Sequence, residues 1–202
     1  MTEFFTRWGL LILSGAALVI IVIFSYLRSV GNSEKGAHRR VSSALRRFAS
    51  VRGYRVLDNV TLHAGSRTLH ADHVLVGYFG LLVVADLCDD GDYYGKLDDP
   101  HWARNTRGSE DNPAVRKGMT PNPLPENLRF VEHLRGIFSR NGVYNISIDS
   151  LAVAANPRSA LFISGRGDIV LALSELRGFL GRDKYSQDNG LDVEKLCSLL
   201  QS

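Results

Sequence analysis

The sequence is poor in cysteine, and its net charge is small. Cys88 and Cys197 are the only two cysteines among 202 residues, and they lie far apart along the chain. Two isolated cysteines form neither a disulfide framework nor a zinc-ligand motif, and they fit a reducing compartment. The 24 Lys and Arg residues nearly balance the 21 Asp and Glu residues, which leaves a formal charge of +3. Neither disulfides nor bulk charge therefore indicates what the chain binds.

Several enzyme motifs are missing as well. No serine-centred hydrolase motif occurs, and the glycine-rich run Gly165–Gly167 lacks the lysine of a phosphate-binding loop, so it predicts a turn. His70, His73 and His101 do not have the spacing of metal ligands. Three further acids lack the spacing of a calcium-binding loop, and we expect them to form a solvated turn: Asp89, Asp90 and Asp92.

The residues that are present indicate a globular protein with an appendage. Hydrophobic residues make up 45% of the chain and charged residues 22%, which is enough for one domain with a folded core. The charges are unevenly distributed. Arg28–Arg55 holds eight Lys or Arg and one acid, whereas Asp86–Asp99 holds six Asp and one Lys. This asymmetry indicates a surface that attracts anions beside a pocket that attracts cations.

One long uncharged hydrophobic run, Trp8–Leu27, has about the 20 residues that a helix needs to cross a bilayer. A cleaved signal peptide is the alternative, but its apolar region would be shorter, and no small-residue cleavage site follows Leu27. Lys and Arg are more numerous after the run than before it, which favours a cytoplasmic C-terminal part. We expect residues 1–30 to form a tail and a single transmembrane helix in a bacterial-type inner (plasma) membrane, and residues 31–202 to form a cytoplasmic domain.

The next predicted helix is amphipathic and rich in arginine. Val41, Leu45 and Phe48 recur at helical spacing on one apolar stripe, and His38 lies on the same stripe. The linker from the predicted membrane helix is short, so this helix lies close to the membrane surface. Four arginines of this helix fall mostly off the stripe: Arg39, Arg40, Arg46 and Arg47. They could contact either anionic lipid headgroups or nucleic-acid phosphates, and both hypotheses remain open.

An antiparallel meander follows this helix. Three apolar runs, Tyr54–Leu62, Thr68–Val76 and Leu81–Leu87, are separated by glycine-containing turns. The third run is apolar on both faces until Asp86, a pattern typical of a central strand covered on both sides. The polar segment 88–122 predicts a long irregular loop, and helices and strands after it make the expected fold α/β. These later elements are helices around 128–138, 174–181 and 191–200 and strands at 146–154, 160–163 and 169–171.

In their order and spacing these pieces resemble the nuclease-related domain family, NERD. The segment Tyr54–Val60 resembles the family's first strand, Ala71–Val76 its acidic second-strand motif and Gly80–Val84 its third strand. Further matching residues are Gly91, Gly95, Trp102 and Asn122-Pro123 with the helix that follows. The resemblance covers roughly Lys35 to Leu180. It implies a restriction-endonuclease-like mixed sheet flanked by helices.

The resemblance also implies a catalytic set that is incomplete here. Family members place a Glu on the first helix, an Asp on the second strand and a Glu-x-Lys at the end of the third, and the carboxylates hold Mg²⁺. His38 stands in the position of the helix Glu, and Asp72 in that of the Asp. Ala85 and Leu87 replace the Glu-x-Lys; they share one face of the strand, and Asp86 points to the opposite face. Asp72 and His38 also have structural explanations. Asp72 could form a hydrogen bond with neighbouring backbone or with an arginine, and His38 could be a buried residue at a helix–sheet contact.

Three functions remain open. The first is a catalytically degenerate binding or scaffolding module, with nucleic acid as one partner and with no cofactor. The second is a divergent metal-dependent nuclease that uses Asp72 with His38, Glu34 or Asp86 and requires Mg²⁺ or Mn²⁺. The third is a module for protein partners at the membrane. The loss of both Glu-x-Lys positions favours the first.

Overall fold

The computed structural model describes residues 19–22, 34–106 and 115–201. In chain order the elements are α2 (Glu34–Ser50), β1 (Arg55–Ala64), β2 (Arg67–Gly77), β3 (Gly80–Leu87), β4 (Asp92–Lys96), β5 (His101–Thr106), β6 (Arg116–Pro121), α3 (Leu124–Arg140), β7 (Ile148–Ala154), β8 (Leu161–Ser164), β9 (Val170–Ala172), α4 (Leu173–Leu180), the 3₁₀ helix η1 (Asp183–Ser186) and α5 (Val193–Leu200). Trp8 and Leu27, the bounds of the predicted transmembrane helix, lie outside the described residues, which include only the helical residues 19–22 of that run. Within the described ranges, no helix is long and apolar enough to span a membrane.

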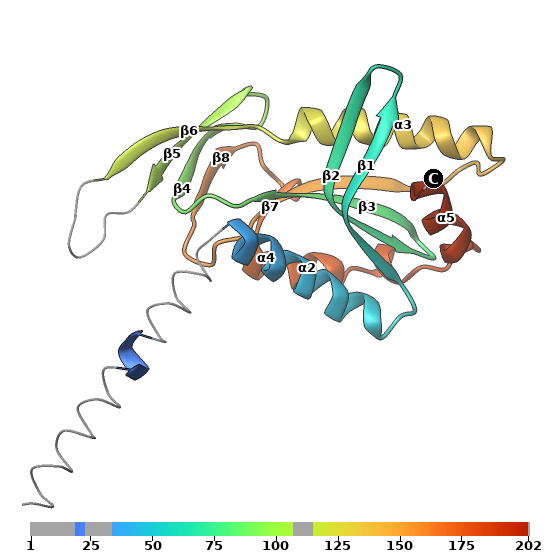
Figure 1. Ribbon diagram of the computed structural model, residues 1–202, viewed down its shortest axis with the longest axis horizontal. Coiled ribbons are helices and arrows are strands. Elements are labelled where there is room, and N and C mark those ends of the chain that lie inside the picture. The colour runs from blue at the N-terminus through green and yellow to red at the C-terminus, as the bar shows by residue number, and fades with distance from the viewer. Residues whose placement is uncertain (1–18, 23–33, 107–114, 202) are drawn as a thin grey trace, which may run out of the picture.

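The described part of the chain forms two mixed sheets (Figure 1). The larger has five strands in the order β1-β2-β3-β7-β9, and the smaller has four in the order β6-β5-β4-β8. Strands β1, β2 and β3 form the predicted antiparallel meander, whereas β7 pairs in parallel with β3 and β9. The expected mixed α/β fold is thus confirmed. The second sheet is an addition that local sequence patterns did not indicate.

Helices cover both faces of the larger sheet (Figure 1). Helix α2 packs on one face through Ala37, Val41 and Leu45, which are 0% exposed and lie one turn apart along a single stripe. Helix α4 belongs to the same buried core, whereas α3 and α5 form a second core on the opposite face. Residues 81–85 of β3 are at most 5% exposed. Strand β3 is therefore the predicted central strand, and its burial contributes about 1.5–3 kcal/mol for each large apolar side chain.

The irregular loop predicted for residues 88–122 is wrong for the described part of that segment, which contains β4, β5 and β6. Tyr93 and Trp102 are 0% exposed and share a core with Leu87 of β3. Strand β8 pairs in parallel with β4, so that Leu161 lies beside Tyr93 although much of the chain separates them. Long-range pairing and two buried aromatic residues stabilise these polar strands. Their own sequences show little apolar alternation, and strand propensity depends on such context.

The remaining predicted elements are confirmed with shifted ends. Strands β7, β8 and β9 and helices α4 and α5 begin and end within about two residues of their expected bounds. Helix α3 begins earlier than expected, at Leu124, and Leu128 is 56% exposed rather than part of its apolar stripe. The predicted turn at 165–167 is present, and Gly165 and Gly167 adopt positive φ values of 78° and 47°.

Candidate functional site

A cleft of about 920 Å³ opens where the first turns of α2 face the ends of β2 and β3. The residues that line it come from segments far apart in the sequence. Among them are all four residues that the sequence analysis named as candidates for catalysis: Glu34, His38, Asp72 and Asp86. The fold therefore brings the candidate residues to one place, and their individual contacts decide what they do there.

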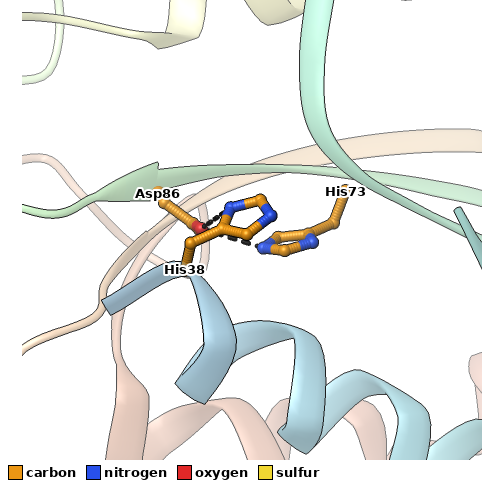
Figure 2. Close-up of side chains that lie close together, drawn as sticks. All are labelled: His38, His73 and Asp86. Atoms are coloured by element: carbon orange, nitrogen blue, oxygen red, sulfur yellow. Dashed lines mark hydrogen bonds and ion pairs between the residues drawn. The ribbon is translucent and has the colours of Figure 1, made fainter. Parts of the chain in front are cut away.

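Asp86 is the centre of a buried polar network in this cleft (Figure 2). Its Oδ2 accepts hydrogen bonds from Nδ1 of His38 at 2.9 Å and from Nε2 of His73 at 2.8 Å. The side chain of Asp86 is 1% exposed, that of His73 is 0% exposed and that of His38 is 23% exposed. The two imidazole rings are stacked, with their centroids 4.2 Å apart. Polar groups buried away from water need hydrogen-bond partners, and these side chains act as partners for one another.

The strand register places three acidic and basic side chains on one face of the meander. Asp58 of β1 lies opposite His73 of β2, and His73 lies opposite Val84 of β3. Asp86 lies two residues beyond Val84 and therefore shares its face. Val84 belongs to the core that α2 covers, and α2 supplies His38. Asp86 therefore projects towards α2, whereas its neighbours in the strand, Ala85 and Leu87, project from the opposite face.

The surroundings of His73 favour its positively charged form. Its Nδ1 donates a hydrogen bond to Oδ1 of Asp58 at 2.6 Å, so both ring nitrogens donate to carboxylates, as in the imidazolium form. Burial alone would lower the pKa of His73, but its hydrogen bonds to Asp86 and Asp58 outweigh burial and raise that pKa. Burial in turn raises the pKa of Asp86, which His73 opposes.

Asp58 is itself held by α2. Oγ of Ser42 donates to its carboxylate at 3.0 Å and Nη2 of Arg46 at 2.6 Å. Burial alone would raise the pKa of Asp58, but hydrogen bonds from Arg46, His73 and Ser42 lower it below its usual value. Arg46 was expected to contact lipid headgroups or nucleic-acid phosphates. In the structure it helps to fix the carboxylate that holds His73, and its side chain is still 57% exposed, so the expected contact stays a prediction.

Asp72 lies on the other face of β2 from His73 and lines the side of the cleft. Its Oδ2 accepts a hydrogen bond from the backbone N–H of Asp86 at 2.8 Å, and its Oδ1 lies 3.4 Å from Nε2 of His70. The sequence analysis left Asp72 either a metal ligand or a residue that bonds neighbouring backbone, and the first contact is such a backbone bond. A single carboxylate with one oxygen already engaged is a poor site for Mg²⁺, which prefers several oxygen ligands.

The positions of the expected Glu-x-Lys contribute no ligand. Ala85 is 5% exposed and Leu87 is 3% exposed. Leu87 packs with Tyr93 and Trp102 in the core beside the smaller sheet. Among the described residues, the only group of three side chains with metal-ligand atoms close together is His38, His73 and Asp86. The side chains present therefore do not fit the carboxylate set that holds Mg²⁺.

The family model of the nuclease-related domain (NERD) matches residues 33–155, more than half of the chain. The chain belongs to this family. No curated protein and no solved structure matches it significantly. The matched segment extends from the residue before α2 to the residue after β7 and contains the whole polar network of the NERD cleft.

The other arginines of α2 have two different environments in the NERD domain. Arg40 donates through Nε to the backbone oxygen of Ala155 at 2.9 Å, and burial lowers its pKa. Like Arg46, it has a structural role that the sequence analysis did not predict. Arg39 and Arg47 are exposed, and Arg39 lines the cleft. These two remain candidates for contact with phosphates or lipid headgroups.

The expectation of a solvated acidic turn is wrong. Each carboxylate has a protein partner: Asp89 pairs with Arg104, Asp90 accepts from Nδ2 of Asn156, and Asp92 accepts from the backbone N–H of Ala160. These bonds fasten the turn after β3 to β5 and to the segment before β8. Asp89 and Asp90 also line the cleft with Glu34, so its lining carries acidic as well as basic side chains.

His73 is the site residue that sequence reasoning missed. It stands next to Asp72 in β2, and no sequence spacing connects it with His38 or Asp86. The available signal was the strand register, because Asp58, His73 and Asp86 share a face once the meander pairs as observed. Apolar periodicity did not settle that register: β3 is apolar on both faces, so a slip by one residue leaves the pattern nearly unchanged.

Proposed function

We propose that this NERD protein is a membrane-anchored, catalytically degenerate module that binds nucleic acid. The observation that carries the proposal is the burial of Ala85 and Leu87, which makes the catalytic Glu-x-Lys position part of the core. Without that Glu and Lys, a restriction-endonuclease-like core lacks the second carboxylate beside Asp72 and the cation that assists at the phosphate. The fold is retained while this chemistry is lost, which leaves binding as the function that the domain can still perform.

Basic side chains at the mouth of the cleft support a phosphate-bearing ligand. Lys35 and Arg39 are exposed, lie one turn apart on α2 and line the cleft. Arg47 is exposed further along the same helix. The acidic side chains in the lining repel phosphate, so we expect the nucleic-acid backbone to lie along α2 rather than in the cleft. Contacts of this kind position a nucleic acid without reading its sequence.

The anchor in this proposal is the hydrophobic run Trp8–Leu27, with the NERD domain on the cytoplasmic side of a bacterial-type inner membrane. Helix α2 begins at Glu34, a few residues after that run, so Lys35 and Arg39 stay close to the bilayer surface. Anionic lipid headgroups then compete with nucleic acid for the same side chains. A protein partner at the membrane is the third candidate ligand, and the binding test below separates it from the other two.

A divergent nuclease is the second candidate function, and one observation favours it. Glu34, His38, Asp72 and Asp86 line a single cleft, so a rearranged site that takes Mg²⁺ or Mn²⁺ would have its residues at hand. The first experiment is therefore a cleavage assay on the full-length chain in mild detergent, with plasmid and single-stranded DNA and either ion. We expect no cutting. Cutting that disappears in Asp72→Ala but persists in the surface control Asp188→Ala would establish the nuclease.

The second experiment measures binding by gel shift at increasing salt concentrations. The variant Lys35→Ala/Arg39→Ala removes the two proposed contacts. The variant Arg129→Ala/Arg135→Ala removes two exposed charges from α3 and serves as the matched control. We expect DNA binding that weakens with salt and is impaired only in the first variant. Binding to anionic vesicles without binding to DNA would assign α2 to lipid, and binding to neither would leave a protein partner.

A further inference from the structure

We propose that His38, His73 and Asp86 form a binding site for a divalent transition-metal ion of the zinc type. The NERD resemblance implies a different ion and different residues on the strands, and the two sets share only the position of His38. The inference goes beyond the proposed function and does not depend on it, because none of the three side chains is among the proposed phosphate contacts Lys35, Arg39 and Arg47.

Three donor atoms already converge in this cluster. The ligand atoms of His38, His73 and Asp86 all lie within 4.8 Å of one another. Nδ1 of His38 and Nε2 of His73 are 2.9 and 2.8 Å from the same carboxylate oxygen. Donors on a tetrahedral metal with bonds of about 2.0–2.1 Å lie about 3.3 Å apart, so each histidine nitrogen would move about 0.4–0.5 Å away from the carboxylate oxygen when an ion binds.

The other ring nitrogens are held as they are in known metal centres. A metal-bound histidine usually donates its second N–H to a carboxylate or carbonyl oxygen. His73 does so through Nδ1 to Asp58, which Arg46 fixes in turn. Nε2 of His38 lies 3.4 Å from the side-chain amide of Asn59, and turning that amide round presents its oxygen instead. Both rings are therefore oriented before an ion binds.

The carboxylate of Asp86 has an unused ligand atom. The side chain of Asp86 is only 1% exposed, and its Oδ1 has no hydrogen-bond partner among the described residues. Buried polar atoms in native proteins almost always have a partner, and a bound ion is one partner that would satisfy this oxygen. His38 is 23% exposed and lines the cleft, so an ion has a route in and an open coordination position.

The donor types select the class of ion. Imidazole nitrogen suits Zn²⁺ and similar ions, whereas Mg²⁺ prefers oxygen. Compared with the site that the resemblance implies, the cluster uses His73 in place of Asp72 and Asp86 in place of residue 85. A displacement of one residue along each strand moves the side chains to the opposite face, under α2. The nitrogen-rich cluster and the lost Mg²⁺ site therefore lie on opposite faces of the same two strands.

Metal binding has a simple proton balance in this network. His73 releases its Nε2 proton to solvent and keeps the Nδ1 proton that it donates to Asp58. His38 binds the ion through Nδ1 and keeps one proton on Nε2, where the turned amide of Asn59 accepts it. The ion then bonds Nε2 of His73, Nδ1 of His38 and the carboxylate of Asp86, and a water from the cleft takes the open position.

The test uses the untagged full-length chain in mild detergent after treatment with a chelator. Zn²⁺ and Mg²⁺ are titrated by calorimetry, and Co²⁺ is followed by visible absorption. We expect one Zn²⁺ per chain, no comparable binding of Mg²⁺, and Co²⁺ bands of four-coordinate intensity. His38→Ala, chosen because His38 is the most exposed of the three, should abolish the bands and weaken Zn²⁺ binding by about tenfold or more. His101→Ala, on the exposed surface of β5, should change neither.

Two results would overturn the inference. One is the absence of a single tight Zn²⁺ equivalent in the unmodified chain. The other is Zn²⁺ binding that is as strong in His38→Ala and in Asp86→Asn as in the unmodified chain, since the ion would then belong to other residues. Circular dichroism confirms that each variant is folded. The gel shift is run on the same samples without added metal, so failure of the metal site and failure of nucleic-acid binding are separate results.

Discussion

At the scale of single residues, two neighbours in β3 have opposite environments. Asp86 turns towards α2 and bonds two histidines, whereas Leu87 turns into an apolar core with Tyr93 and Trp102. Alternation along the strand is the cause of this separation. The family's catalytic lysine would project from position 87, where a charged side chain would now displace apolar contacts. Leu87 therefore tests whether this position has become structural.

Leu87→Ala should lower the free energy of unfolding by about 2–4 kcal/mol, because it removes buried methyl groups and leaves a cavity between β3 and the smaller sheet. Urea unfolding of the full-length chain, followed by circular dichroism, measures the change. Leu128→Ala is the matched control: Leu128 is 56% exposed, so the loss should stay within about 0.5 kcal/mol. A loss below about 1 kcal/mol for Leu87→Ala would contradict the assignment of position 87 to the core.

Asp58 gives a second prediction at this scale. Asp58→Asn leaves the buried His73 with one carboxylate instead of two, so we expect a loss of about 2–3 kcal/mol when a chelator is present. Ser42→Ala removes one hydrogen bond to Asp58 without removing charge, and should cost about 1 kcal/mol. Thermal unfolding of both variants makes the comparison. Equal losses would show that the charge of Asp58 does not stabilise His73.

At the scale of secondary structure, a charged pair connects α4 to the turn between β8 and β9. Two nitrogens of Arg166 donate to the carboxylate of Glu175 at 2.9 and 3.0 Å, and Glu175 accepts a further bond from the backbone N–H of Ala172 at the start of the helix. The hydrogen bonds from Arg166 are the largest cause of the lowered pKa of Glu175. The carboxylate is also placed favourably, at the N-terminus of α4.

A lowered pKa in the folded state means that ionised Glu175 stabilises the fold above its unfolded pKa of about 4.3. Glu175→Gln should therefore be less stable than the unmodified chain at pH 7. The difference should stay below about 1 kcal/mol, because Glu175 is 42% exposed and solvent screens the pair. It should shrink as the pH falls through the folded pKa, since Glu175 then loses its charge. Urea unfolding at pH 7 and pH 3 tests this, and an unchanged difference would refute it. Glu132→Gln, an exposed substitution on α3, is the control.

At the scale of the whole molecule, α2 stands between the proposed anchor and the cleft. One face of this helix contributes to the core of the larger sheet, and its exposed basic residues are the proposed phosphate contacts. His38 projects from the same helix to Asp86. A ligand on the outer surface of α2 and an ion in the cleft would therefore act on one element of the fold.

Phosphate contacts predict a defined salt dependence. Each contact with duplex DNA contributes about −0.9 to the slope of log K against log salt concentration. Lys35→Ala/Arg39→Ala should therefore reduce the magnitude of that slope by about 2, whereas Arg129→Ala/Arg135→Ala on α3 should leave it unchanged. Gel shifts at four or more salt concentrations measure both slopes. Equal slopes in the two variants would place the nucleic acid elsewhere on the domain.

The anchor predicts how the protein fractionates. The full-length chain should stay with membranes after washing with high salt and alkaline carbonate, because burial of an apolar run of about 20 residues does not depend on charge. A chain that starts at Gly31 should be released into the supernatant. If that shorter chain leaves the membrane only at high salt, the arginines of α2 bind lipid headgroups. Release of the full-length chain by carbonate would disprove the anchor.

The family, the amphipathic helix α2, the three-stranded meander and the central place of β3 could all be predicted from the sequence. Each of these depends on local signals: helical spacing of Val41 and Leu45, glycine turns between apolar runs, and an apolar run without alternation. The replacement of Glu-x-Lys by Ala85 and Leu87 was also visible in the sequence. These features are set within a few residues of one another, so tertiary contacts do not alter them.

The smaller sheet and the members of the buried network could not be predicted from local sequence patterns. Polar strands β4–β6 depend on the burial of Trp102 and on pairing with β8, which comes much later in the chain. The contact of His73 with Asp58 and Asp86 depends on strand register. Which arginines of α2 form bonds within the fold depends on the acids and carbonyl groups that lie next to the helix. All of these are long-range contacts between residues that local periodicity does not connect.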